Sequence, residues 1–200
     1  MNKEIERKYT IKYLPDDIFI EKIENIEQVY IYHDKNTLIR IRKIESKMKD
    51  KKQSLNYIYT VKTKGDIQYE NSCNVAQKYE IESNITKEYY EELLPRRISN
   101  KITKTRLVVP IQNNLKVEID IYYDYLEGFL TAEVEFPNEE DANKFNKPDW
   151  LGEELGYKEL SNRKLAEMSK EEFRSKVSEE FMNKNKIIID KLNKLIKNCY

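Results

Sequence analysis

The sequence predicts an α+β fold, in which an eight-stranded antiparallel closed β-barrel has covering helices and a C-terminal helix. Eight short stretches alternate apolar and polar residues with a period of two, as strands with one buried face do. On the polar side of most of these stretches, the charges are sorted by sign. From Ser169 onward, apolar residues instead recur at helical spacing.

These two periods give the predicted elements in chain order. The predicted strands are residues 4–11, 28–33, 38–44, 56–64, 78–82, 102–109, 115–123 and 130–136. The predicted helices are residues 15–26, 85–95, 138–146 and 169–197. Residues 147–168 follow neither period, so we expect an irregular stretch there.

Local start and stop signals support the helices. Pro15, followed by two aspartates, suits the first turn of a helix. Thr86 is a typical N-cap, and Pro95 ends the helix that it opens. Ser169 with Glu172 fits a capping box. The lysine-rich stretch 47–52 reads instead as a solvated loop, which could also steer polyanions toward a site.

Charged side chains share one face in seven of the predicted strands. An open sheet with one face in water would also alternate in this way. However, neighbouring like charges repel, and a face that serves only solubility would mix the two signs. The alternative is a closed barrel with its charges inside, since eight strands leave room for one small ligand. Buried charges of both signs need partners, and a polyanion with divalent cations supplies them.

Composition excludes several classes of function. The 36 Lys and Arg balance 36 Asp and Glu, so the broad basic field of a nucleic-acid binder is missing. No apolar run approaches the ~20 residues of a membrane span, and the first residues contain no signal-peptide core. The 2 cysteines form no disulfide framework, so we expect a cytoplasmic protein.

Missing motifs and residue types exclude further kinds of binding site. His33 is the only histidine, which excludes a His-rich zinc site. Neither GxxxxGK[ST] nor GxGxxG occurs, so side chains must bind any phosphate. Arginine and lysine bind phosphate oxygens, and carboxylates bind hard cations such as Mg²⁺ or Mn²⁺.

Glu4-Ile5-Glu6-Arg7-Lys8 forms an ExExK pattern, and it is followed in order by the motifs LIRIR, YTVKTKG, KYEIE, ITKTR, VEIDIY, TAEVEF and SNRKLA. Through these motifs, residues 4–166 resemble the CYTH superfamily, the triphosphate tunnel metalloenzymes, and in particular the bacterial inorganic triphosphatases. ExExK is the signature of that family, and the other motifs follow in the family's order. One departure is the stretch Ala76-Gln77-Lys78-Tyr79-Glu80, where the family commonly has an Arg and a Glu before the acid; Lys78 could supply the missing phosphate contact.

The resemblance implies roles for individual residues. Implied metal ligands are Glu4, Glu6, Glu118, Asp120, Glu133 and Glu135. Implied phosphate ligands are Lys8, Arg40, Arg42, Lys62, Lys64, Lys104 and Arg106. Implied catalytic residues are Glu4, Glu6 and Lys8, and further contributors are Lys78, Glu80 and Arg163.

The resemblance also implies an activity, namely hydrolysis of inorganic triphosphate, or a related organic triphosphate, with Mg²⁺ or Mn²⁺ in a charged tunnel. Alternatives on the same scaffold are a class IV-type adenylyl cyclase that makes cyclic AMP, a thiamine triphosphatase and a non-catalytic polyphosphate-binding module. We expect residues 1–166 to form the tunnel domain and residues 167–200 a helical extension packed on it. The expected partner is a small triphosphate, with no nucleic acid or membrane, and the protein would be a monomer or homodimer.

Overall fold

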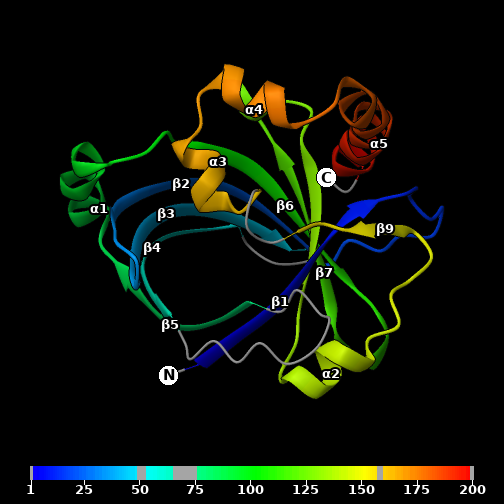
Figure 1. Ribbon diagram of the computed structural model, residues 1–200, viewed down its shortest axis with the longest axis horizontal. Coiled ribbons are helices and arrows are strands. Elements are labelled where there is room, and N and C mark those ends of the chain that lie inside the picture. The colour runs from blue at the N-terminus through cyan, green and yellow to red at the C-terminus, as the bar shows by residue number, and fades with distance from the viewer. Residues whose placement is uncertain (1, 49–52, 65–75, 157–159, 199–200) are drawn as a thin grey trace.

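Within the described residues, nine antiparallel strands form one sheet, which is strongly curved (Figure 1). The computed structural model describes residues 2–48, 53–64, 76–156 and 160–198. The strands are β1 (Asn2–Ile11), β2 (Lys22–His33), β3 (Thr37–Met48), β4 (Ser54–Lys64), β5 (Ala76–Ile85), β6 (Ile102–Pro110), β7 (Lys116–Tyr122), β8 (Leu130–Glu135) and β9 (Leu151–Glu154). All eight predicted strands are therefore present, and the α+β class is confirmed.

The described residues also form five α-helices and three short 3₁₀ turns. The helices are α1 (Lys87–Leu93), α2 (Glu139–Lys144), α3 (Asn162–Glu167), α4 (Lys170–Lys176) and α5 (Glu179–Asn198). The 3₁₀ turns are η1 (Leu94–Arg96), η2 (Gln112–Asn114) and η3 (Asp124–Leu126). No helix in the described ranges is long and apolar enough to cross a bilayer.

The prediction of a closed eight-stranded barrel needs two corrections, both at β1. The strand order is β5-β4-β3-β2-β6-β7-β8-β1-β9, so the sheet has a ninth strand. One edge of β1 pairs with β8, and its other edge is divided, with β5 beside Asn2–Glu6 and β9 beside Tyr9–Ile11. Because β5 meets only the first half of β1, the sheet is not closed along its length. The short β9, which contains Gly152, lacks the alternation that would have predicted it.

The predicted helix 15–26 is wrong, because β2 begins at Lys22. Ile23 and Ile26 are both buried although they lie on opposite faces of this strand. A strand that is buried on both faces loses its period-two pattern, and the remaining spacing imitates a helix.

The C-terminal segment contains two helices where one was predicted. The capping box is confirmed, since Ser169 Oγ accepts from the Glu172 N–H and the Glu172 carboxylate accepts from the Ser169 N–H. Val177 then adopts an extended conformation that ends α4. Ser178 Oγ accepts from the Phe181 N–H at the start of α5. Helix α3 lies in the stretch predicted to be irregular, and loop residues 49–52 lie outside the described residues.

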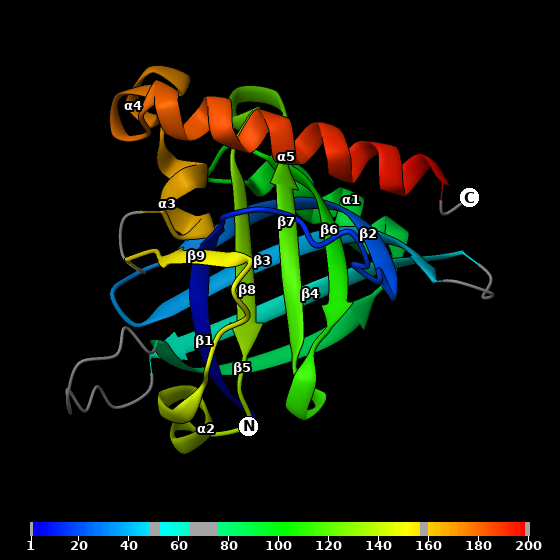
Figure 2. The same cartoon turned by 90° about the vertical axis from the view of Figure 1, so that its right-hand side faces the viewer.

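The apolar core lies on the outside of the curved sheet, between the strands and the helices. Helix α5 crosses this outer face (Figure 2), where Ile188 and Leu192 pack against Val117 and Ile119 of β7. Helix α1 covers β2 and β3 through Tyr90 and Leu93. Because the apolar side chains of the strands point outward to the helices, the alternate side chains point to the interior.

We predict that Leu192→Ala lowers the free energy of unfolding by about 2–4 kcal/mol, because it opens a cavity where a fully buried side chain joins α5 to the sheet. Ile187→Ala is the matched control on the same helix, because Ile187 is exposed and should cost less than ~0.5 kcal/mol. Urea unfolding measures both. Equal midpoints for the two variants would show that α5 does not contribute to the folded core.

Candidate functional site

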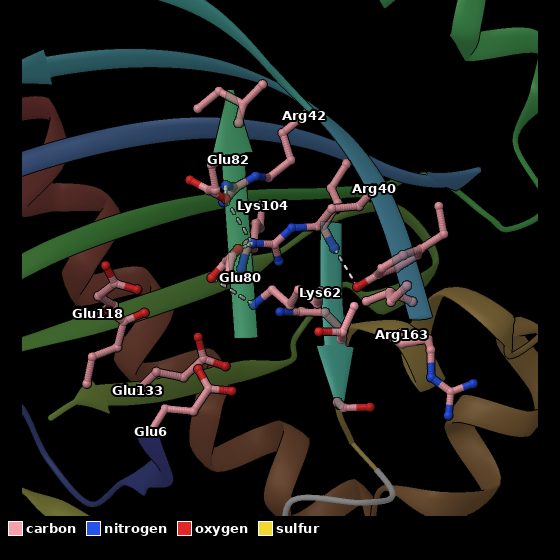
Figure 3. A pocket seen from close by; sticks show the side chains of 18 of the residues that line it. Glu6, Arg40, Arg42, Lys62, Glu80, Glu82, Lys104, Glu118, Glu133 and Arg163 are labelled. Carbon is pink, nitrogen blue, oxygen red and sulfur yellow. Dashed lines mark hydrogen bonds and ion pairs between the residues drawn. The ribbon is translucent and has the colours of Figure 1, made fainter. Parts of the chain in front are cut away.

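The curved sheet surrounds a cavity of about 500 Å³. Inward-facing side chains of both signs line it, together with the β2–β3 turn and the first turn of α3 (Figure 3). The predicted site residues that line the cavity are Glu6, Lys8, Arg40, Arg42, Lys62, Glu80, Lys104, Arg106, Glu118, Glu133, Glu135 and Arg163. The alternation of the strands thus brings twelve of the predicted residues, from seven strands and one helix, around one space.

The remaining four predicted residues are Asp120, Glu4, Lys64 and Lys78. Asp120 is fully buried behind the cavity wall, where it forms ion pairs with two lining residues, Lys104 and Arg106. Glu4, Lys64 and Lys78 belong to β1, β4 and β5, but their side chains lie outside the part of the chain that the structure describes.

Arg106 is the centre of the first of two charge clusters. Its guanidinium donates to both Asp120 oxygens at 2.7 Å and to Glu133 at 2.9 Å, and it also pairs with Glu118. We call the side chains that meet here the Arg106 cluster, which consists of Lys8, Lys104, Arg106, Glu118, Asp120 and Glu133. Three cations therefore face three carboxylates on β1, β6, β7 and β8.

The two lysines of the Arg106 cluster differ in pKa. Burial lowers the pKa of Lys8, but Glu133, whose carboxylate lies 2.7 Å from Lys8 Nζ, outweighs burial and the pKa is raised overall. Burial and the charge of Arg106 together lower the pKa of Lys104 to about 8, although Asp120 opposes them. Lys8 is therefore a permanent cation at neutral pH, whereas Lys104 can exchange its proton there.

The carboxylates of the cluster also differ. Burial alone would raise the pKa of Asp120 and that of Glu133, but the adjacent cations lower both. Burial raises the pKa of Glu118, and the negative charges of Asp120 and Glu133 raise it further. Arg106 lowers this pKa but only partly compensates. Glu118 is therefore the carboxylate of this cluster that most readily takes up a proton.

The second cluster lies on β3, β4 and β5, and we call it the Arg40 cluster. It consists of Arg40, Arg42, Lys62, Glu80 and Glu82. Arg40 lies 3.0 Å from Glu80 and 3.4 Å from Glu82, Arg42 pairs with Glu82, and Lys62 lies 3.4 Å from Glu80. Cations exceed carboxylates here by three to two, so this wall of the cavity favours an anion.

Several lining residues were not predicted as part of the site. Glu82 lies two residues after Glu80, so strand alternation places it on the same face, and this spacing is the signal that could have found it. The others come from β2, the β2–β3 turn, β3, β4 and the start of α3, namely Glu24, Gln28, Tyr30, Asp34, Lys35, Asn36, Thr37, Leu38, Ile44, Ile58, Thr63, Ser161 and Asn162. Glu24 was hidden by the wrong helix at 15–26. Gln28 and Tyr30 are neutral, so a search by charge could not find them.

The carboxylates could hold a hard cation, but they do not form a ready cage for one. Within the described residues, no three acidic, cysteine or histidine side chains converge as such a cage requires. Arg106 and Lys8 occupy the acidic oxygens instead. Magnesium commonly binds through one or two carboxylates together with substrate phosphates, and Glu6, Glu118, Glu133 and Glu135 offer oxygens of that kind on the cavity wall.

Comparison with known proteins identifies a relative of this chain. A protein of Nitrosomonas europaea named inorganic triphosphatase is 28% identical over 165 residues, which are 82% of this chain and 96% of that protein. The chain is a homologue of that triphosphatase. A crystal structure described as that of the inorganic triphosphatase NE1496 aligns over 84% of this chain and 97% of that one, with 28% identity and a TM-score of 0.54.

A second crystal structure, described as the hypothetical protein NE1496, aligns over 82% of this chain and 97% of that one, with 28% identity and a TM-score of 0.52. No family model matches the sequence. The resemblance to inorganic triphosphatases that the ordered motifs predicted is confirmed by these relatives.

The ion pair between Arg42 and Glu82 makes the free energy of unfolding vary with pH in the acidic range. Burial raises the pKa of Glu82, but the charge of Arg42, hydrogen bonds with Glu80 and Thr60 and the charge of Arg40 together outweigh it, and the pKa falls from an ordinary 4.5 to about 2. Because the folded-state pKa is lowered, this stabilisation is complete above pH 4.5 and is lost as the pH falls toward 2. We predict that Glu82→Gln makes the loss of Tm between these pH values shallower than in the wild type.

Glu92→Gln is the control for this measurement, because Glu92 is exposed on α1 and far from the cavity. Its Tm should follow the wild-type pH profile. A Glu82→Gln profile parallel to that of the wild type would contradict the assigned ion pair.

Proposed function

We propose that this protein is a divalent-metal-dependent triphosphatase that hydrolyses inorganic triphosphate in the cavity described above. The observation that carries the proposal is the gathering of both charge signs around one space of about 500 Å³, where cations suit phosphate oxygens and carboxylates suit a metal. Homology to the Nitrosomonas europaea triphosphatase along 96% of that protein supports it.

The Arg40 cluster would bind the phosphates. Arg40 and Arg42 have side chains that are only 11% exposed, and burial with the neighbouring Arg40 lowers the pKa of Arg42 to about 10. Arg42 is still charged at neutral pH, but it is costly to bury beside another cation. A phosphate that enters between them relieves this repulsion and takes two-pronged hydrogen bonds from each guanidinium. Lys62 adds a third cation, and Lys64 and Lys78 are proposed to extend the row.

Mg²⁺ or Mn²⁺ would be held by the carboxylates on the opposite wall. Glu6 and Glu135 are register partners on β1 and β8, and Glu118 and Glu133 are partners on β7 and β8. We assign Glu4 to the same set by its place on β1. Asp120 supports this set as the partner of Arg106. When bound, the ion neutralises charge that develops on phosphoryl oxygens.

The lysines have separate roles in the proposed reaction. Lys8 Nζ remains charged, so it can hold a phosphate oxygen or orient the attacking water but does not take up the water's proton. Lys104 Nζ, with a pKa of about 8, can exchange a proton near neutral pH. Arg106 contacts Glu133, the partner of Lys8, and Asp120, the partner of Lys104. The charges are therefore already in place before the substrate binds.

We further propose that residues 1–166 carry the activity and that residues 167–200 support the sheet from outside. The packing of Ile188 and Leu192 against β7 favours this role over that of a dimerising helix. A cytoplasmic location and a small triphosphate as sole partner remain part of the proposal, because the balanced charge and the 2 cysteines favour them.

Phosphate release from inorganic triphosphate, ATP and thiamine triphosphate with Mg²⁺ or Mn²⁺ tests the activity. We predict metal-dependent turnover that is fastest on inorganic triphosphate. Arg42→Ala should lower kcat/KM by roughly 100-fold, since a positioned cation at a phosphoryl group is worth about that much. Glu6→Ala should raise the metal concentration that half-saturates the enzyme.

Lys43→Ala is the matched control for Arg42→Ala, because Lys43 is the next residue of β3 and points outward to Glu27. It should leave turnover within about twofold. Absence of metal-dependent turnover on all three substrates would refute the hydrolase. Formation of cyclic AMP from ATP would instead favour an adenylyl cyclase.

A further inference from the structure

The first turn of α3 forms part of the cavity wall. Ser161, Asn162 and Arg163 line the cavity. The carbonyl oxygen of Leu160, just before this turn, lies 3.4 Å from Lys8 Nζ and accepts a hydrogen bond from it. In Figure 3, Arg163 lies across the pocket from Glu118 and Glu133, whereas the contact of Leu160 with Lys8 brings the start of the turn to the Arg106 cluster.

Tyr122 connects this turn to the interior of the sheet. It is 1% exposed, and it follows Glu118 and Asp120 on the same face of β7. Its hydroxyl donates to Asn162 Oδ1 at 2.7 Å. The ammonium of Lys104 lies 5.6 Å from the centre of its ring. One side chain thus contacts both the Arg106 cluster and the wall formed by α3.

Other contacts hold the remainder of α3. Tyr125 donates to the Leu165 carbonyl oxygen at 2.9 Å, and Asn100 donates to the Met168 carbonyl oxygen at 2.9 Å. Leu165 and Ala166 are fully buried. These contacts secure the second half of the helix independently of Tyr122, whereas the Tyr122 hydroxyl acts on the turn that faces the cavity.

We propose that Tyr122 is a positioning residue whose hydroxyl fixes Asn162, and that the turn held in this way selects triphosphates with a free phosphate at both ends. This inference rests on the proposed function, because it concerns the same cavity. A turn fixed against the wall leaves less room for an ester group beyond the last phosphate. A free terminal phosphate is smaller and carries one more ionisable oxygen than an esterified one, which suits the Arg40 cluster, where cations exceed carboxylates.

The hydrogen bond from the Tyr122 hydroxyl to Asn162 explains how one hydroxyl affects the selectivity of the site. Loss of the donor leaves Asn162 Oδ1 without the partner that sets its position, so the turn can shift. Because Leu160 and Lys8 are in contact, such a shift also changes the surroundings of the Lys8 ammonium. The ring of Tyr122 packs in the core with Phe129 and Leu165, and a phenylalanine would preserve that packing.

Binding measurements test this proposal without turnover. Isothermal titration calorimetry in EDTA gives the Kd of inorganic triphosphate and that of ATP, and their ratio measures the selectivity. Tyr122→Phe and Asn162→Ala should each lower this ratio by about tenfold, as expected for loss of one well-placed hydrogen bond. The double variant should lose no more than either single variant, because both remove the same contact.

Tyr125→Phe is the matched control, since it removes a tyrosine hydroxyl that binds the same helix away from the cavity. It should keep the wild-type ratio within about twofold. Equal ratios for Tyr122→Phe and Tyr125→Phe, or a wild-type protein that binds both ligands equally, would overturn the proposal and leave the proposed function intact. Absence of binding of inorganic triphosphate to the wild type in EDTA would overturn the proposal, whereas absence of metal-dependent turnover in the phosphate-release assay would overturn both.

Discussion

The buried pair of Arg106 and Asp120 is the interaction on which the rest of the site depends. Asp120 has no exposed surface, and burial of an unpaired carboxylate costs several kcal/mol. Two-pronged contact with Arg106 and the Lys104 ammonium at 2.5 Å compensate this cost. Arg106 in turn contacts Glu118 and Glu133, so this pair fixes the geometry of two cavity carboxylates.

The same ion pairs explain how so many charges can share a small space before a ligand binds. Each cation that we assign to phosphate contacts and whose side chain the structure describes is paired with a carboxylate, for example Arg40 with Glu80 and Lys8 with Glu133. A triphosphate with its metal can replace these partners sign for sign. Binding then exchanges ion pairs and does not create new buried charge, which reduces the desolvation cost of a highly charged ligand.

The sequence predicted most of the strands and most of the charged residues that line the cavity, because both depend on one local rule. Strand alternation places Arg40, Arg42, Lys104 and Arg106 on the same side as Glu118 and Glu133, whatever the details of the sheet. The divided edge of β1 could not be predicted, because it depends on long-range pairing with β5 and β9. The role of β2 was obscured by burial on both of its faces, and α3 has too few residues to show a period.

The free energy of unfolding of Asp120→Asn, measured in urea at neutral pH, tests the central claim most directly. The variant leaves the cations Arg106 and Lys104 buried together without their shared carboxylate, so we expect a loss of about 3–5 kcal/mol. Glu135→Gln, at an exposed position of β8, should change the value by less than ~0.5 kcal/mol. An Asp120→Asn protein as stable as Glu135→Gln would contradict the account.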